Sequence, residues 1–218
     1  DAAGQKNLVG TFHAPALVVA DPAFLDTLDD RQLRAGYAEL VKYGLIEDPD
    51  FFAWCARNGP ALLTGDHDAR HRGIAYAVAA KARFVAEDFH DRLGRRALLN
   101  LGHSFGHAIE AVTGFGPVLH GEAVALGMCL AFDLSVELEL CPEADRDRVR
   151  THLSAVGLPT KLADVGVEGA SLLPFMRQDK KVEDRTSLTL VLARGIGQAF
   201  VARDIAPERL ADFLDRSA

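Results

Sequence analysis

The chain has 218 residues, of which 49% are hydrophobic, and it carries a formal net charge of −7 at pH 7. A chain of this length buries a sizeable core, either as one large domain or as one domain with part of another. The acidic balance argues against binding to nucleic acid, so any anionic ligand must be held by a local cluster of cations. Charge or glycine interrupts every apolar stretch within about 18 residues, so we expect no membrane span.

Cysteine usage indicates the compartment. Cys55, Cys129 and Cys141 are odd in number and form no Cys-x-x-Cys pair. This favours a reducing cytoplasm and argues against a thiolate zinc site. The chain opens Asp-Ala-Ala-Gly-Gln-Lys, which lacks the basic and apolar parts of a secretory leader. We therefore expect a cytoplasmic protein.

The first 28 residues are typical of the end of a larger unit. Residues 16–20 form a short β-branched run of strand type, which Asp21 and Pro22 terminate. Few other strands are predicted nearby, and a lone strand is not stable without partners. We expect residues 1–28 to end an N-terminal domain, with this strand completing a sheet made by residues absent from the chain, and residues 29–218 to form a second domain.

Hydrophobic periodicity predicts that the second domain is mainly α-helical. Segment 122–134 is nearly all apolar, so we expect it to be the buried core helix. Two β-type runs joined across Gly195-Ile-Gly197 predict a small hairpin. The expected helices are 29–45, 49–63, 66–87, 122–134, 142–156, 172–178 and 207–214, and the expected strands are 187–192 and 198–202.

A histidine-rich stretch lies between residues 95 and 127. On a helix, His103 and His107 lie one turn apart on the same face, and the glycines beside them leave room for a ligand or a second backbone. A histidine on an apolar face is usually a hydrogen-bonded core residue, and a His-x3-His pair alone is a weak signal. A third histidine, His120, follows a Gly-Phe-Gly-Pro turn, which favours a metal or substrate site.

Polar residues upstream of these histidines strengthen that interpretation. Arg95 and Arg96 form a basic pair, and Asn100 stands where it could cap the histidine-bearing helix. Glu39 lies among apolar neighbours with Lys42 three residues later. A surface ion pair is the ordinary interpretation of that spacing. The carboxylate lies beside the apolar stripe of its helix, however, which favours a functional role.

Five motifs occur in the order found in the 3-dehydroquinate synthase family, which this chain resembles over nearly all of its length. They are Gly-Gln-Lys-Asn-Leu-Val-Gly at 4–10, Ala-Glu-Leu-Val-Lys-Tyr-Gly at 38–44, Arg-Ala-Leu-Leu-Asn-Leu-Gly-His-Ser-Phe-Gly-His at 96–107, Leu-His-Gly-Glu-Ala-Val at 119–124 and Asp-Lys-Lys at 179–181. The resemblance implies a helical metal-binding C-terminal domain, preceded by the last strand of a Rossmann-like NAD domain that is otherwise absent here.

The resemblance also implies a Zn²⁺ or Co²⁺ ion held by Glu39, His103 and His120. One carboxylate and two imidazoles form a known catalytic zinc set, which leaves a position open for substrate oxygens. Such a metal polarises hydroxyl and carbonyl groups as a Lewis acid. In the family pattern His107 contacts substrate and transfers protons, and it is not a ligand.

The implied substrate is 3-deoxy-arabino-heptulosonate 7-phosphate, which carries both a carboxylate and a phosphate. An acidic protein must gather local cations to hold it. The implied catalytic residues are His107, Lys42 and Asn100. The implied substrate-binding residues are Asn7, Lys42, Lys81, Arg96, Asn100, His107 and Lys180, and those implied to contact NAD are Lys6, Phe24, Leu25, Asp26 and Thr27.

The implied reaction forms 3-dehydroquinate and phosphate in the shikimate pathway of aromatic amino-acid biosynthesis. It proceeds by oxidation with NAD, phosphate elimination, re-reduction, ring opening and aldol closure, so NAD is recycled. The alternatives are a sister sugar-phosphate cyclase, a metal-dependent polyol dehydrogenase, and a non-catalytic helical domain with a vestigial site. The basic set favours the 3-dehydroquinate-forming enzyme over its sister cyclases, and the Glu-His-His set argues against a vestigial site. We expect a homodimer when full length, a small-molecule substrate, and no activity from this piece alone.

Overall fold

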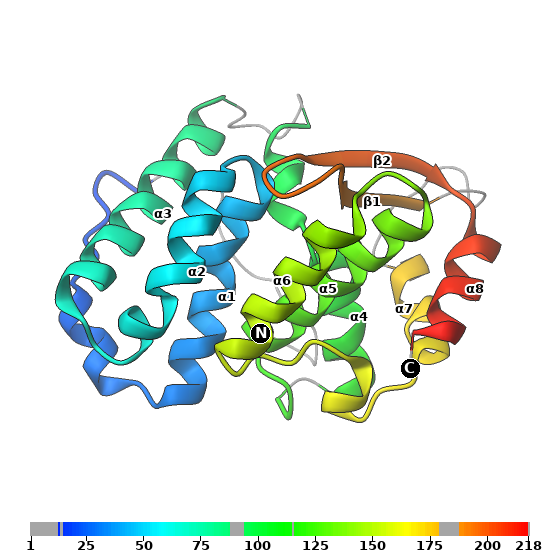
Figure 1. The fold of residues 1–218 in the computed structure, drawn as a ribbon, viewed down its shortest axis with the longest axis horizontal. Coiled ribbons are helices and arrows are strands. Elements are labelled where there is room, and N and C mark those ends of the chain that lie inside the picture. The colour runs from blue at the N-terminus through cyan, green and yellow to red at the C-terminus, as the bar shows by residue number, and fades with distance from the viewer. Residues whose placement is uncertain (1–12, 14, 88–93, 115, 179–187, 218) are drawn as a thin grey trace.

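The computed structural model describes residues 13, 15–87, 94–114, 116–178 and 188–217. Within these ranges the chain is mainly helical and carries an antiparallel pair of strands, which confirms the predicted fold class (Figure 1). Three residues with predicted roles, Lys6, Asn7 and Lys180, lie outside the described ranges. No helix of the described part is both long and apolar enough to cross a membrane.

The elements are labelled in chain order, with η for a 3-10 helix (Figure 1). The first part of the chain contains η1 (Pro22–Thr27), α1 (Asp30–Ile46), α2 (Pro49–Leu63), α3 (His67–Glu87), η2 (Arg96–Asn100), α4 (His103–Thr113) and α5 (His120–Glu137). The second part contains α6 (Glu143–Ala155), η3 (Leu162–Val165), η4 (Gly169–Ser171), α7 (Leu173–Gln178), β1 (Leu188–Ala193), β2 (Ala199–Ile205) and α8 (Pro207–Arg216).

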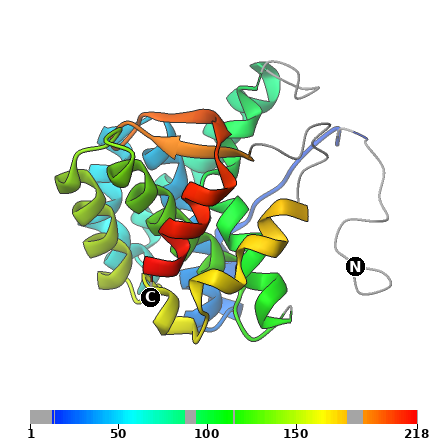
Figure 2. The same ribbon diagram turned by 90° about the vertical axis from the view of Figure 1, so that its right-hand side faces the viewer.

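The segment before η1 differs from the sequence-based expectation. Residues 16–20 form no strand, and Leu17, Val18 and Val19 are 78%, 71% and 80% exposed. A strand needs a hydrogen-bonded neighbour, and none of the described residues pairs with this segment. In Figure 2 it runs outside the helical body before entering η1. The predicted strand is therefore not formed in this structure.

Helices α1, α2 and α3 begin where the sequence predicted, each after an aspartate cap. Side-chain oxygens of Asp29, Asp48 and Asp66 accept hydrogen bonds of 2.8–2.9 Å from backbone N–H groups in the first turns. Each bond satisfies a donor that the helix itself leaves unpaired. The predicted bounds agree with the observed ones to within a residue, because caps and apolar periodicity point to the same boundaries.

Helix α5 is the core of the domain, as its apolar sequence predicted. Most of its residues are buried, and it packs against α1, α4, α6 and β1. Close contact with α4 depends on glycine, since a β-carbon on Gly127 would lie 2.0 Å from the carbonyl oxygen of Gly102. The helix axes can therefore approach closely at this point. In Figure 1, α4 and α5 lie at the centre of the molecule.

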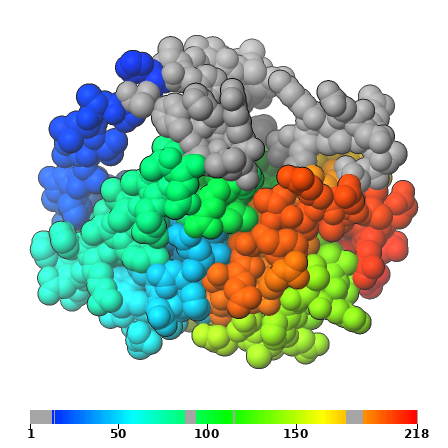
Figure 3. Space-filling model, turned by 90° about the horizontal axis from the view of Figure 1, so that it is seen from above, coloured from blue at the N-terminus to red at the C-terminus, as the bar shows by residue number. Residues whose placement is uncertain are grey.

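The predicted hairpin forms and closes one end of the helical body. Strands β1 and β2 pair antiparallel, with Leu190 opposite Ala202 and Leu192 opposite Phe200. At their turn, Gly197 donates a backbone hydrogen bond to the Leu45 carbonyl at 3.0 Å. Viewed from above, the orange hairpin lies between the cyan α1–α2 region and the yellow-green α6 region (Figure 3). The predicted helices near residues 142–156, 172–178 and 207–214 also form, as α6, α7 and α8.

Candidate metal centre

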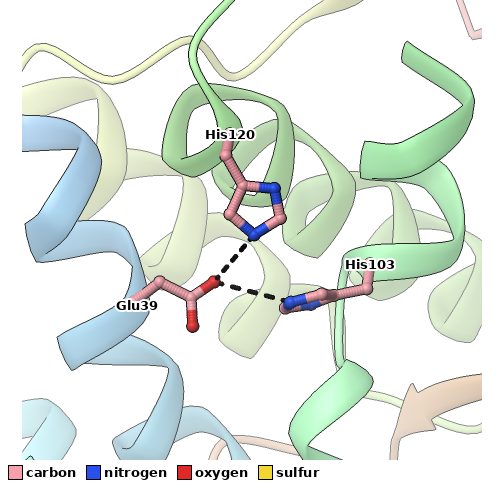
Figure 4. A group of neighbouring side chains, drawn as sticks. All are labelled: Glu39, His103 and His120. Carbon is pink, nitrogen blue, oxygen red and sulfur yellow. Dashed lines mark ion pairs between the residues drawn. The ribbon is translucent and has the colours of Figure 1, made fainter. Parts of the chain in front are cut away.

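Three side chains from three helices converge between α1, α4 and α5 (Figure 4). The Oε1 atom of Glu39 lies 3.6 Å from His103 Nε2 and 3.8 Å from His120 Nε2. One potential ligand atom from each residue lies within 4.8 Å of the other two. Zn²⁺ bonds to nitrogen and oxygen of about 2.0–2.2 Å place tetrahedral ligand atoms roughly 3.3 Å apart. The group is therefore close to the size that a single ion requires.

The start of α4 is set by a glycine, and this corrects one sequence-based expectation. Gly102 caps the helix in the left-handed region at φ 81°, and a β-carbon there would lie 2.7 Å from the Val124 carbonyl oxygen. Asn100 instead ends η2 and is not the cap. Because both the conformation and the close approach favour glycine, Gly102 fixes where His103 enters the site.

The start of α5 is fixed by an ion pair with α1. Both carboxylate oxygens of Glu122 accept hydrogen bonds from the Arg31 guanidinium, at 2.6 and 2.7 Å, and Arg31 also donates to the Pro117 carbonyl. Glu122 Oε2 accepts the Leu119 N–H at 2.9 Å as well. This bidentate geometry holds the first turn of α5. It therefore orients His120, the first residue of that helix.

Both histidines turn the same ring nitrogen toward Glu39. Nδ1 of His103 lies 3.3 Å from the Leu101 carbonyl oxygen, and Nδ1 of His120 lies 3.3 Å from Oε1 of Glu110. With Nδ1 so occupied, Nε2 is the nitrogen available for a metal. Sequence reasoning assigned no role to Glu110. Its only sequence signal was an acidic residue within the apolar stretch of α4.

A buried cation balances the charge of Glu39. Lys42 is 3% exposed, and its Nζ donates a hydrogen bond of 2.6 Å to Glu39 Oε2. An acidic residue and a lysine three residues apart on a helix usually form a surface ion pair. Here the lysine of the pair is buried. Burial lowers the pKa of Lys42, although Glu39 opposes that change, and the charge of Lys81 on α3 adds to the lowering. Lys81 is thus placed within electrostatic reach of the site.

The protonation states suit metal binding. Burial would raise the pKa of Glu39, but the charges of Lys42 and the two histidines outweigh it and leave the pKa below its usual value. Burial, aided by the Lys42 charge, lowers the pKa of His103 to about 4. At neutral pH the group thus offers a carboxylate and a neutral imidazole, the forms that bind metals.

An unsatisfied oxygen provides a direct test of whether a cation fits. Oε1 of Glu39 is buried and has no hydrogen-bond partner among the described residues. It is the same atom that faces both histidines, while Oε2 is bound by Lys42. A buried acceptor without a partner is costly. A cation held between Oε1 and the two Nε2 atoms would remove that cost.

Three of the predicted substrate residues lie on α4 or on η2, the element before it. His107 is exposed, and its ring centroid lies 5.5 Å from that of His103 and 6.1 Å from that of His120. It is not one of the three grouped ligands. Arg96 and Asn100 are exposed at the two ends of η2, which precedes α4. The structure thus places neutral and basic donors on segments that adjoin the three grouped residues.

Four of the five residues predicted to contact NAD lie in η1, which packs on α3, and the fifth, Lys6, lies outside the described residues. Phe24 is 72% exposed, and the Asp26 carboxylate pairs with the Arg70 guanidinium. The Thr27 hydroxyl donates to the Phe24 carbonyl at 2.7 Å. Leu25 is partly buried. The ion pair anchors η1 to α3, and contact of this segment with a dinucleotide stays a prediction.

Known proteins match this chain over nearly all of its length. The family model for the C-terminal part of 3-dehydroquinate synthase matches residues 36–182, and that for the N-terminal part matches residues 1–35. The 3-dehydroquinate synthase of Rhodospirillum rubrum is 58% identical over 206 residues, covering 91% of this chain and 52% of that protein. The Zymomonas mobilis enzyme is 51% identical over 213 residues, covering 96% and 56%.

Two solved structures of other enzymes share the fold of this chain. A 2-epi-5-epi-valiolone synthase from Streptomyces hygroscopicus subsp. jinggangensis, with NAD⁺ and Zn²⁺ bound, superposes with a TM-score of 0.83 at 30% identity, covering 97% of this chain and 58% of that one. A 2-deoxy-scyllo-inosose synthase complexed with carbaglucose-6-phosphate, NAD⁺ and Co²⁺ gives 0.78 at 25% identity, covering 100% and 60%.

The fold and the three grouped residues define a helical domain with a candidate metal centre of the Glu-His-His type. The chain spans about half the length of the curated relatives it matches. With 147 of its residues matched by the C-terminal family model, the chain belongs to the 3-dehydroquinate synthase family.

Proposed function

We propose that the complete protein containing this chain is a 3-dehydroquinate synthase, which converts 3-deoxy-D-arabino-heptulosonate 7-phosphate to 3-dehydroquinate and phosphate. The observation that carries the proposal is the unsatisfied Oε1 of Glu39, which faces His103 and His120. It occurs in a chain that is about half identical to enzymes of that name. Residues 29–218 would supply the metal and substrate side, and residues 1–28 the end of the nucleotide domain.

Glu39, His103 and His120 would hold Zn²⁺ or Co²⁺ through Oε1 and the two Nε2 atoms. When bound, the ion supplies Lewis-acid polarisation of substrate hydroxyl and carbonyl oxygens, and NAD supplies hydride exchange. Lys42 keeps the Glu39 carboxylate ionised by binding its other oxygen. The side chains of Glu39 and His120 are 39% and 43% exposed, so a substrate can reach the group.

Other residues of this chain would bind the substrate and move its protons. His107 stands beside the two ligand histidines and would exchange protons with the substrate on its phosphate side. The substrate carries two anionic groups, so several cations are needed in a protein of net negative charge. The proposed donors are Lys42, Lys81, Arg96 and Lys180, with Asn7 and Asn100 as neutral donors.

The reaction would regenerate NAD in each turnover. One carbinol is oxidised, phosphate leaves from the neighbouring acidified position, the ketone is reduced again, and ring opening precedes the aldol closure. Hydride transfer requires the nicotinamide to be held against the reacting carbon. Residues 1–218 alone are therefore proposed to be inactive. We also propose a homodimer for the complete protein and a cytoplasmic location, which the three unpaired cysteines support.

The test is turnover by the complete protein with Zn²⁺, NAD⁺ and 3-deoxy-D-arabino-heptulosonate 7-phosphate. Phosphate should be released in equal amount to 3-dehydroquinate, with no net NADH. Two results would contradict the proposal. NADH accumulating from a phosphate-free polyol would indicate a dehydrogenase, and phosphate release only from another sugar phosphate, such as a hexose 6-phosphate, would indicate a sister cyclase.

Lys180 separates these alternatives further, because a dehydrogenase has no use for a phosphate-binding cation. Loss of one charge-assisted contact is worth roughly 2–3 kcal/mol, or some thirty- to hundredfold in rate. Lys180→Ala should reduce kcat/KM for the phosphorylated substrate by that factor and leave zinc content unchanged. Lys161→Ala, at an exposed lysine before η3, serves as the control. An unchanged rate for Lys180→Ala would remove this argument for a phosphate-eliminating cyclase.

A further inference from the structure

Glu110 is a buried acidic residue in the C-terminal half of α4. It is 3% exposed, and its neighbours Ile109 and Ala108 are fully or almost fully buried. A carboxylate in such surroundings is costly unless it is paired and hydrogen-bonded. The cost of this position indicates that Glu110 has a functional partner, and its carboxylate contacts a candidate metal ligand, His120.

The contact between Glu110 and His120 joins two helices. Oε1 of Glu110 lies 3.3 Å from His120 Nδ1, on the side of the ring opposite the nitrogen that faces Glu39. A carboxylate accepts a hydrogen bond from Nδ1–H and so places the remaining proton of a neutral imidazole on that nitrogen. The Nε2 lone pair is then directed at Glu39 Oε1, 3.8 Å away.

The two histidines are held differently, and the difference explains why one needs a carboxylate. The side chain of His103 is 14% exposed, and its Nδ1 contacts the backbone carbonyl oxygen of Leu101 at 3.3 Å. The side chain of His120 is 43% exposed, so packing restrains its ring less. The buried Glu110 supplies the restraint that packing does not. An anionic acceptor also increases the basicity of the imidazole toward a metal.

We propose that Glu110 is a positioning residue for the metal site: it fixes the tautomer and orientation of His120 and so strengthens metal binding without touching metal or substrate. This inference rests on the proposed metal site. It goes beyond it by predicting that metal affinity depends on a residue of α4 that is not a ligand. Loss of such a carboxylate partner typically weakens metal binding 10- to 100-fold.

The test measures affinity, not turnover. The complete protein and its Glu110→Gln and Glu110→Ala variants are titrated with Zn²⁺ in competition with a chelator, and the visible absorption of the Co²⁺ forms is recorded. Glu110→Ala should bind Zn²⁺ 10- to 100-fold more weakly and show an altered Co²⁺ spectrum. Glu110→Gln keeps an oxygen that can accept Nδ1–H, so its affinity should lie between those of Glu110→Ala and the parent protein.

A matched control separates positioning from general damage to the fold. Asp133 is a partly buried acidic residue on α5, and its carboxylate pairs with Arg150 away from the three ligands. Asp133→Asn should leave Zn²⁺ affinity within about twofold of the parent, whatever it does to stability. A loss as large as that of Glu110→Ala would overturn the proposal, because metal affinity would then only follow stability.

A double-mutant cycle gives the sharpest outcome. In a His120→Ala background, titrated at Zn²⁺ concentrations high enough to fill its weakened site, Glu110→Ala should cause no further loss of Zn²⁺ affinity, since the ring that Glu110 positions is absent. Equal losses in both backgrounds, or unchanged affinity in Glu110→Ala and Glu110→Gln, would overturn the positioning role. Absence of Zn²⁺ binding by the parent protein would overturn the proposed metal site itself, and the two failures are thus distinguishable.

Discussion

Gly121 at the start of α5 lies directly against Ala35 of α1. A β-carbon on Gly121 would be 1.9 Å from the carbonyl oxygen of Ala35, which is far inside van der Waals contact. Glu39 lies one helical turn after Ala35, and His120 immediately precedes Gly121. The missing side chain at residue 121 therefore permits the close crossing of α1 and α5 that brings Glu39 to His120.

Gly121→Ala should both destabilise the protein and weaken its metal site. The added methyl group cannot be accommodated without moving α1 from α5, and such overpacking typically costs about 1–3 kcal/mol. We expect the free energy of unfolding to fall by that amount and Zn²⁺ affinity to fall with it. Urea unfolding and chelator competition measure the two effects.

Gly36 is the matched control for that substitution. It lies on the same helix, α1, and a β-carbon there would meet nothing within 4 Å. Gly36→Ala should be neutral or should stabilise the protein by up to about 1 kcal/mol, because alanine is the better helix former. Equal destabilisation by the two alanines would show that the contact with Ala35 is not the cause.

The zinc content of alanine variants should distinguish the two ligand histidines from His107. Alanine at His103 or His120 removes an Nε2 atom that faces Glu39 Oε1 at 3.6 or 3.8 Å, so each variant should lose zinc. His107→Ala removes a ring outside the grouped ligands and should keep zinc while losing turnover. Atomic absorption on the dialysed proteins checks this. Loss of zinc from His107→Ala as readily as from the other two would refute the assignment.

Two adjacent arginines should have different effects. Arg95 donates to Glu87 Oε2 and Glu47 Oε2 at 2.8 and 2.7 Å and lies over the Phe84 ring at 4.9 Å. Arg95→Ala should therefore lower the free energy of unfolding by about 1 kcal/mol, the scale of a partly exposed ion-pair network. Thermal unfolding measures this loss, and Arg95→Lys should restore only part of it, since one ammonium cannot reproduce the planar fork.

Arg96 is the proposed substrate ligand of the pair. Arg96→Ala should reduce kcat/KM thirty- to hundredfold, as expected for loss of one charge-assisted contact of roughly 2–3 kcal/mol. Steady-state kinetics on the complete protein measures it. If Arg95→Ala lowered kcat/KM more than Arg96→Ala at a temperature where both are folded, the division of roles would be wrong.

The sequence was informative where local signals agreed. Apolar periodicity predicted α1, α2 and α3, which aspartate caps also support, and an almost continuous apolar run predicted α5. The capping residue of α4 was missed, because Asn100 has the better side chain for a cap but the close approach of Val124 requires Gly102. That requirement comes from a helix distant in sequence, and no local pattern contains it.

The sequence predicted the candidate metal ligands, but it did not predict the residues that orient them. The resemblance to a family supplied Glu39, His103 and His120, which the structure brings together. Glu110 and Arg31 were not identified, since their roles depend on which helices face one another. The strand expected at residues 16–20 does not form, because its sheet partners are not among the described residues. Local propensity alone does not hold a strand.

His152 on α6 is expected to make stability depend on pH. It is 7% exposed, its Nε2 lies 2.8 Å from the Tyr37 hydroxyl, and its ring meets that of Phe52 edge-on. The Tyr37 hydroxyl also donates to the Cys55 carbonyl, and the Arg148 guanidinium lies 5.8 Å from the centre of the Phe52 ring. No carboxylate is among these contacts, so burial lowers the pKa of His152 from 6.5 to about 4.

The sign of the effect follows from that lowered pKa. Below pH 6.5 the unfolded chain binds a proton at His152 that the folded protein does not bind until about pH 4. The stabilisation is therefore fully present above pH 6.5 and is lost as the pH falls toward 4, by roughly 2 kcal/mol between pH 7.5 and pH 5. His152→Gln removes this titration, so the pH dependence of its free energy of unfolding should be shallower by that amount. Urea unfolding followed by Trp54, the only tryptophan among the 218 residues, measures both proteins at each pH. Parallel curves for the two proteins between pH 7.5 and pH 5 would show that His152 already binds its proton in the folded state.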